Sequence, residues 1–343
     1  METVHRIEVD DARELDLPDD SVELVVTSPP YPMIELWDDL FSDLDPAVAD
    51  ALDDGDGDRA FELMHDVLDE VWAEVARVLA PGGIVCVNVG DATRRLDDRF
   101  RQYPNHATVI DRLTAHGVDP LPDVLWRKPV NSLTKFMGSG MLPPNAYATL
   151  EHEYILVFRN GGLREFEPRD RQRYESAYFW EERNEWFSDV WTDVTGTSQA
   201  LDCDRADRDR SGAFPLAIPY RLISMFSVYG DTVLDPFWGT GTTTLAAMLA
   251  GRNSVGYELD SGLRRTFDDR LDDLPARSRR LLADRIKRHR TFLDDHPEKA
   301  NYDTEYYDFS VVTKQERKIR HYTVEDIKKR DDEYVVVHKS YAG

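Results

Sequence analysis

The sequence of 343 residues has little cysteine, little lysine and no long apolar run, and each absence excludes a class of protein. Its two cysteines, Cys86 and Cys203, are too few for a disulfide framework or a cysteine-based metal site. The sequence has no run of about 18 apolar residues, which a transmembrane helix would need. Its first residues lack the basic and apolar segments of a signal peptide. We therefore expect a cytoplasmic protein with no membrane association and no metal site.

Positive charge is also scarce. The chain has 66 acidic and 42 basic residues, a formal net charge of -24, and only Lys128 and Lys135 precede Lys287. An ordinary acidic protein is one interpretation. We favour adaptation to multimolar salt, because the acidic residues are spread along the whole chain. In ordinary salt this charge would repel nucleic acid, whereas at 1 M salt the Debye length is about 3 Å and the repulsion is largely screened.

Apolar runs alternate with helical patterns, which predicts an α/β sheet. Residues 22–27 are typical of a buried parallel strand that leads into a loop, and the acidic segment 39–58 is expected to be a loop or a mobile lid. Residues 131–213 break the alternation. The other expected strands are 7–9, 84–89, 124–126, 154–158, 232–234 and 253–257, and the expected helices are 61–79, 106–116, 219–228 and 243–250.

A glycine-rich turn opens the last of these helices. It has the sequence DPFWGTGTT from Asp235 to Thr243, and Glu258 stands 17 residues beyond Gly241, at the end of the next strand. Glycines allow a close approach of the backbone to a ligand, and a carboxylate at that place can accept hydrogen bonds from both ribose hydroxyls. Because GxGxxG and GxxxxGK[ST] are absent, we expect a nucleoside ligand without a phosphate chain, such as S-adenosylmethionine. A tight structural turn is the alternative.

A second motif, Ser28-Pro29-Pro30-Tyr31, ends the strand at 22–27. Two prolines stiffen the loop and remove two N–H donors, so that the Ser28 hydroxyl and nearby carbonyls are left as acceptors. An exocyclic amine of a nucleic acid base offers two N–H donors beside a flat ring, and Tyr31 could stack on that ring. Hydrogen bonds to Ser28 and to the Pro29 carbonyl would favour a pyramidal, nucleophilic nitrogen. A proline turn with a buried tyrosine is the alternative.

Together the two motifs resemble the amino-methyltransferases of DNA in the permuted order called the beta group. In that order the [DSN]PP[YF] loop comes first, the target-recognition region second and the DPFxGxGTT half last, as in residues 1 to 262 here. The resemblance implies a Rossmann-like, mostly parallel sheet of seven strands with an inserted target-recognition region. It implies S-adenosyl-L-methionine as cofactor. The implied catalytic residues are Ser28, Pro29, Pro30 and Tyr31, and the implied cofactor-binding residues are Asp11, Asp235, Phe237, Gly239, Gly241, Thr242 and Glu258.

The resemblance also divides the chain. Residues 1–130 are expected to be the catalytic half, 131–213 the target-recognition region, 214–292 the cofactor-binding half and 293–343 a charged C-terminal extension. Serine as the first letter of SPPY is more usual for N4-cytosine enzymes, and aspartate for N6-adenine enzymes. C5 methylation is not expected, because it needs a thiolate and neither cysteine is placed to attack a base.

The expected partner is double-stranded DNA, with the target base flipped out of the duplex. The candidate DNA contacts are Lys128, Asn131, Lys135, Arg169, Arg171 and Arg173, with salt bridges to nearby acids as the alternative for the arginines. Residues 135–154 and the acidity look most like haloarchaeal N4-cytosine methylases assigned to CTAG sites. An N6-adenine or RNA enzyme and a non-catalytic DNA-binding relative stay open as alternatives. A partner restriction endonuclease and the oligomeric state are not determined by the sequence.

Overall fold

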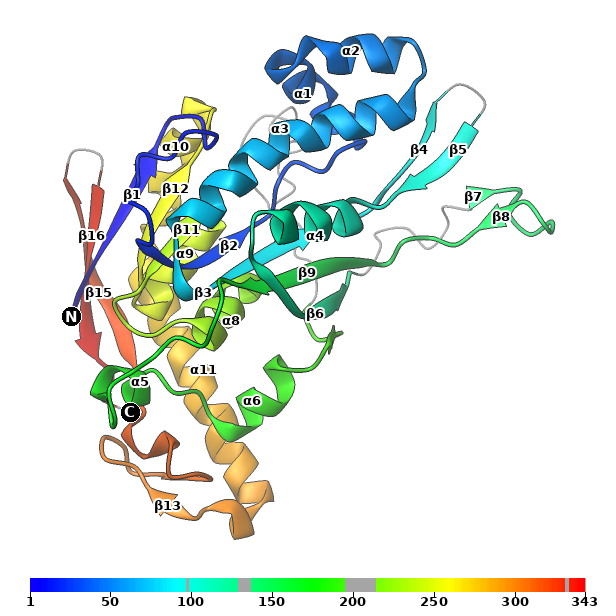
Figure 1. The fold of residues 1–343 in the computed structure, drawn as a ribbon. Helices are drawn as coiled ribbons and strands as arrows, with labels where there is room; N and C mark the ends of the chain where they lie inside the picture. The colour runs from blue at the N-terminus through cyan, green and yellow to red at the C-terminus, as the bar shows by residue number, and fades with distance from the viewer. Residues whose placement is uncertain (97–98, 129–136, 195–213, 331–332, 343) are drawn as a thin grey trace.

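The computed structural model describes residues 1–96, 99–128, 137–194, 214–330 and 333–342, and these residues form a central sheet of ten strands (Figure 1). Helices cover both faces of the sheet. In spatial order the strands are β10 (Val190–Trp191), β6 (Asp119–Arg127), β9 (His152–Arg159), β3 (Leu79–Val89), β2 (Val22–Thr27), β11 (Thr232–Asp235), β12 (Asn253–Tyr257), β1 (Glu2–Glu8), β16 (Glu333–Ser340) and β15 (Tyr322–Arg330).

The seven strands from β6 to β1 are mostly parallel. Each neighbouring pair from β3 to β1 is parallel, and β9 alone among the seven runs antiparallel to its neighbours β3 and β6. The predicted α/β fold class is therefore confirmed, but the predicted number of strands is wrong for the whole sheet. Strand β10 adds to one side, and the antiparallel hairpin of β15 and β16 pairs with β1 on the other. This hairpin satisfies backbone groups that β1 would otherwise present as an open sheet edge.

The helices form two layers, each with an apolar cluster against one face of the sheet. One layer holds α1 (Asp38–Leu44), α2 (Pro46–Asp53), α3 (Gly57–Val78) and α4 (Asn105–Ala115). The other holds α8 (Ala217–Phe226), α9 (Thr242–Ala250) and α11 (Leu274–Asp295). Three short helices complete the described set: α5 (Arg171–Glu175), α6 (Trp180–Trp186) and α10 (Ser261–Phe267). No helix in the described ranges is long and apolar enough to cross a membrane.

The acidic segment 39–58, expected to be a loop or lid, is mostly helical. Helices α1 and α2 occupy it, and α2 begins at Pro46 with the Asp45 side chain accepting a hydrogen bond from Ala47 N. Phe41, Val48 and Ala51 are buried under the exposed acids. Together with the partly buried Leu44, Ala47 and Leu52, these residues belong to the apolar cluster that includes α3, which docks the two helices on it.

The range 131–213, predicted to be the target-recognition region, is described in part, over residues 137–194. Strand β9 lies inside this range but occupies the sheet between β6 and β3. Two hairpins extend beyond the sheet on the same side (Figure 1), β4 (Ala92–Leu96) with β5 (Arg99–Tyr103), and β7 (Met137–Gly138) with β8 (Ala146–Tyr147). They touch through Phe100 and Tyr147, whose stacked rings have centroids 4.7 Å apart.

The C-terminal residues 293–343 are tied into the fold and are more than a charged tail. Strands β15 and β16 extend the sheet, and a small cluster of Phe309, Val311 and Ile319 packs against Phe179 and Ile286. The short pair β13 (Tyr302–Asp303) and β14 (Ser310–Val311) lies in this part as well.

Candidate active site

The two predicted motifs lie side by side, at the ends of neighbouring strands. Strand β2, which leads into the SPPY loop, pairs with β11, which leads into the glycine-rich turn. From this pair the chain continues in opposite directions, from β2 to β3 and from β11 to β12. Thr27 Oγ1 donates a hydrogen bond of 2.6 Å to Asp235 Oδ1 and joins the two strand ends. Ligands of open α/β sheets bind at such a reversal, outside the carboxyl ends of the strands, which we call the carboxyl edge.

The glycine-rich turn is closed by Glu258, which follows β12. Its two carboxylate oxygens accept hydrogen bonds from Gly239 N at 2.8 Å and Asp260 N at 2.9 Å. Each oxygen keeps a further lone pair, so that Glu258 can still accept from ribose hydroxyls. Burial is the main cause that raises the pKa of this carboxyl. Gly239 has a φ of +54°, and a Cβ there would meet only Phe237 O at 3.8 Å, which leaves the backbone open to a ligand.

The glycine-rich turn is also fixed by close packing against neighbouring side chains. Gly241 has a φ of +76°, and a Cβ on it would lie 2.6 Å from Trp238 and Phe267 atoms. Trp238 in turn lies flat against β12, since a Cβ on Gly256 would come within 2.1 Å of its ring. The indole Nε1 donates to Thr244 Oγ1 at 2.8 Å. The turn is therefore held rigidly between α9 and β12.

Two buried polar groups beside the turn suit a positively charged nucleoside. Burial raises the pKa of Asp235 to about 6, and a nearby cation would favour its ionised form. Thr240 Oγ1 is buried and has no hydrogen-bond partner among the described residues. S-adenosylmethionine carries a sulfonium and an ammonium group, so this donor set fits it. Ser28, Asp235 and Glu258 thus share one edge of the sheet.

Of the remaining predicted cofactor residues, Phe237 and Thr242 lie in or next to this turn, whereas Asp11 follows β1. Phe237 is half-buried and packs edge-on against Trp72, with ring centroids 5.6 Å apart. Thr242 is buried in the first turn of α9. Asp11 is engaged by Arg13, which donates to Oδ2 through Nη2 at 2.7 Å, and this interaction holds the pKa of Asp11 below its usual value.

The SPPY loop is anchored from below and exposes its first residue. Pro29 is buried, whereas Ser28 and Tyr31 are half-buried. Asn105 Nδ2 donates to Pro32 O at 3.1 Å and to Gly90 O at 3.0 Å, which ties the loop to the end of β3. Loop position is therefore set by backbone contacts as well as by its prolines.

Tyr31 is the centre of a polar network that sequence reasoning did not identify. Its hydroxyl lies 3.1 Å from Ser28 Oγ, 3.2 Å from Glu153 Oε2 and 2.9 Å from Asn88 Nδ2. Asn88 Nδ2 also donates to Glu153 Oε2 at 2.7 Å, and Lys128 Nζ donates to Glu153 Oε1 at 2.6 Å. Burial first, and then Glu153, raise the pKa of Tyr31 well above its usual value, so the phenol stays protonated.

Comparison with known proteins decides the family. A family model described as DNA methylase, for N6 and N4 methyltransferases, matches residues 22–268. The chain is a DNA methyltransferase of this family. It is 50% identical over 341 residues to the Type II methyltransferase M.MthZI of Methanothermobacter thermautotrophicus, covering 97% of this chain and 95% of that protein. It is 48% identical over 281 residues to M.MjaI of Methanocaldococcus jannaschii, covering 78% of this chain and 91% of that one.

A solved structure gives the same assignment. A DNA modification methylase of Thermus thermophilus, in complex with S-adenosyl-L-methionine, matches with a TM-score of 0.61 and 34% identity, covering 80% of this chain and 94% of that chain. The family is dependent on S-adenosyl-L-methionine, which is therefore the cofactor of this methyltransferase. When bound, it supplies an electrophilic methyl group.

The predicted DNA contacts of the methyltransferase separate into two places. Lys128 follows β6 and joins the polar network of Tyr31 through Glu153, and Asn131 and Lys135 lie outside the described residues. Arg169, Arg171 and Arg173 lie at the opposite edge of the sheet, where the parallel strands begin, which we call the amino edge. There Ser176 Oγ, just after α5, accepts a hydrogen bond from Tyr229 N, ahead of β11.

The β4–β5 hairpin, at the carboxyl edge of the sheet, carries arginines that were not predicted as DNA contacts. It follows β3 directly and carries Arg94, Arg95, Arg99 and Arg101. Arg94 pairs with Asp38, and Arg99 and Arg101 pair with Asp58. The signal in the sequence was four arginines within eight residues.

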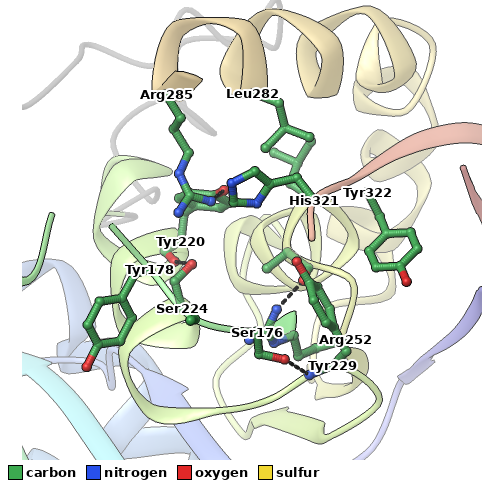
Figure 2. Close-up of a pocket in the computed structure, with 13 residues that line it drawn as sticks. Ser176, Tyr178, Tyr220, Ser224, Tyr229, Arg252, Leu282, Arg285, His321 and Tyr322 are labelled. Carbon is green, nitrogen blue, oxygen red and sulfur yellow. Dashed lines mark hydrogen bonds between the residues drawn. The ribbon is translucent and has the colours of Figure 1, made fainter. Parts of the chain in front are cut away.

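A small internal pocket of the methyltransferase is not its active site. It offers about 20 Å³, which is enough for one water molecule. Figure 2 shows its lining, in which Arg252 and Tyr229 come from the segments that precede β12 and β11. His321 Nε2 is buried there without a hydrogen-bond partner in the described part of the chain. The pocket therefore belongs to the amino edge.

Proposed function

We propose that this methyltransferase methylates N4 of cytosine in duplex DNA. The observation that carries the proposal is the Ser28 hydroxyl at the carboxyl edge, 3.1 Å from the Tyr31 hydroxyl and one strand away from the cofactor turn. Serine in this place is more usual for N4-cytosine enzymes than for N6-adenine enzymes. Cys86, the cysteine within the described residues, is fully buried in β3, and burial raises the pKa of its thiol, which argues against a C5 reaction through a thiolate.

In this proposal the chain activates the amine by accepting hydrogen bonds from its N–H groups. The N4 lone pair of cytosine is conjugated into the ring and is a poor nucleophile. Ser28 Oγ and the Pro29 carbonyl accept hydrogen bonds from the two N–H groups and favour a pyramidal nitrogen. Tyr31 stacks on the extruded base, which stacking stabilises by about 1–3 kcal/mol. Ser28 has no covalent role.

We further propose a short duplex site, CTAG, as target. This part rests on the likeness of residues 135–154 and of the overall acidity to haloarchaeal N4-cytosine methylases. Recognition is assigned to the target-recognition region within residues 131–213, together with Lys128, Asn131 and Lys135 as DNA contacts. The base leaves the duplex to reach the site.

The test is single-turnover methylation of duplex DNA with and without CTAG, followed by mass analysis of the nucleosides. We expect N4-methylcytosine, and Ser28→Ala should slow the transfer by about 10²–10³-fold while cofactor affinity is kept. N6-methyladenine or 5-methylcytosine as product would refute the assigned base. A Ser28→Ala enzyme as fast as wild type would refute the assigned role.

We also propose that the acidity is an adaptation to molar salt. A net charge of -24 destabilises the fold by self-repulsion when screening is weak. Thermal stability and methylation rate should both rise from 0.1 M KCl into the molar range. Full activity at 0.1 M with loss above 1 M would contradict this proposal.

A further inference from the structure

The Tyr31 hydroxyl has one proton and several neighbours, so the network has a definite direction. Glu153 comes from β9, between Lys128 at the end of β6 and Asn88 on β3, and its side chain is 11% exposed. A carboxylate only accepts hydrogen bonds, and a hydrogen bond to a charged acceptor is stronger than one to a neutral acceptor. The Tyr31 proton is therefore directed to Glu153 Oε2 at 3.2 Å.

The other acceptor near the Tyr31 hydroxyl, the Asn88 carbonyl at 3.4 Å, is neutral and farther away than Glu153 Oε2. Once Tyr31 donates to Glu153, its oxygen can only accept from the two remaining groups that can donate. Asn88 Nδ2 donates to it at 2.9 Å. The remaining contact, 3.1 Å to Ser28 Oγ, must then carry the serine proton towards Tyr31. The lone pairs of Ser28 Oγ are then free to accept hydrogen bonds from the substrate.

We propose that Glu153 is a positioning residue that makes Ser28 a hydrogen-bond acceptor, acting through Tyr31. The inference rests on the proposed function, in which Ser28 accepts from the base amine. A serine hydroxyl can donate or accept, unlike the aspartate that many amino-methyltransferases carry in its place. Glu153 removes that ambiguity.

Lys128 has a part in this arrangement. Its ammonium group, a donor only, lies 2.6 Å from Glu153 Oε1. In a Glu153→Gln variant the side chain has only one terminal oxygen, although hydrogen-bond donors face both of its terminal atoms. Lys128, the charged donor, takes the amide oxygen, so the amide NH₂ faces both Tyr31 and Asn88 Nδ2. Asn88 then loses the acceptor that Glu153 Oε2 provides at 2.7 Å. Tyr31 must then accept from Gln and donate to Ser28, which reverses the network.

The experiment is a double-mutant cycle in single-turnover methylation with saturating cofactor and DNA. Glu153→Gln and Tyr31→Phe should each slow methyl transfer about tenfold or more, the loss expected for one hydrogen bond to a charged group. The dissociation constants for S-adenosylmethionine and DNA should stay within about twofold. The double variant should be no slower than the slower single one, because Glu153 acts through Tyr31.

A rescue variant distinguishes an effect of hydrogen-bond direction from an effect of side-chain packing. Lys128→Met in the Glu153→Gln background frees the amide to turn its oxygen to Tyr31, so this double variant should be faster than Glu153→Gln alone. Glu151→Gln, a neighbouring exposed acid paired with Arg127 at 3.4 Å, is the matched control and should equal wild type.

The outcomes are distinct. Tyr31→Phe or Glu153→Gln at wild-type speed, multiplicative effects in the cycle, or no rescue by Lys128→Met would each overturn the inference. If Ser28→Ala is slow in the same assay, the proposed function survives that result. If Ser28→Ala is as fast as wild type, the proposed function itself fails.

Discussion

The two edges of the sheet both bury charged and polar groups, but they use them differently. At the amino edge the guanidinium groups are satisfied within the protein. Arg285 forms two 2.7 Å hydrogen bonds with Glu182, and Arg252 donates to Ser227 and Ala250. At the carboxyl edge Ser28 and Glu258 keep unused acceptor capacity, and Thr240 Oγ1 has no partner among the described residues. Paired groups such as Arg285 and Glu182 stabilise the fold, whereas the open groups of the carboxyl edge are available to a ligand. His321 Nε2 at the amino edge also has no partner among the described residues, but its pocket has room for only one water molecule.

The largest expected effect is on stability, at the amino edge. Glu182→Ala leaves the buried Arg285 without its carboxylate, and breaking such a pair costs about 3–5 kcal/mol. Chemical denaturation should show this loss, while the methylation rate per folded molecule stays unchanged. Asp273→Ala, which breaks an exposed pair with Arg280, is the control and should cost about 0–1 kcal/mol. A lower transfer rate in folded Glu182→Ala would mean that the edges are coupled.

The next effect is on cofactor binding, at the carboxyl edge. Glu258→Ala removes a charged acceptor of ribose hydroxyls and should weaken S-adenosylmethionine binding by roughly 1.5–3 kcal/mol. Titration calorimetry measures this, with the exposed Glu2→Ala as control on the neighbouring strand. Unchanged affinity would remove Glu258 from the cofactor site.

The smallest expected effect is on the dependence of DNA affinity on salt, which tests whether DNA contacts one edge of the sheet or both. Arg171 pairs with Glu175 at 2.7 Å, and Arg173 lies over the Phe166 ring, so both have structural partners at the amino edge. Replacing Arg169, Arg171 and Arg173 together by alanine should leave the dependence of DNA affinity on salt unchanged. Lys128→Ala, which removes a predicted DNA contact beside the Tyr31 network, should lower that slope by about 1. An equal drop in the arginine triple variant would show that DNA reaches both edges.

The sequence was sufficient for the parts of the fold in which local pattern and tertiary role agree. The buried runs at β2 and β12 were predicted to the residue, because strands of a parallel sheet are apolar on both faces. The two motif loops were also placed correctly at strand ends, because Gly239 and Gly241 adopt positive φ values that favour glycine and because two prolines cannot continue the hydrogen bonds of a central strand.

The failures have physical causes. Helices α1 and α2 bury only Phe41, Val48 and Ala51, too few apolar residues to show a helical period among so many acids. Helix α11 buries Ser278, Arg285 and His289 along with its apolar residues, so only half of its buried residues are apolar. Glu153 could not be recognised as a site residue, because only the register of β6, β9 and β3 brings it to Tyr31.

The contact between Trp238 and Gly256 constrains how this enzyme can diverge. Because there is no room for a Cβ between the indole and β12, the residues at these two positions can change only together. Relatives that keep tryptophan at the first position should keep glycine at the second, and a larger residue at the second should occur only with a smaller ring or none at the first. Substitutions at these two sites should therefore be correlated across the family, even though neither side chain touches DNA in the proposed reaction.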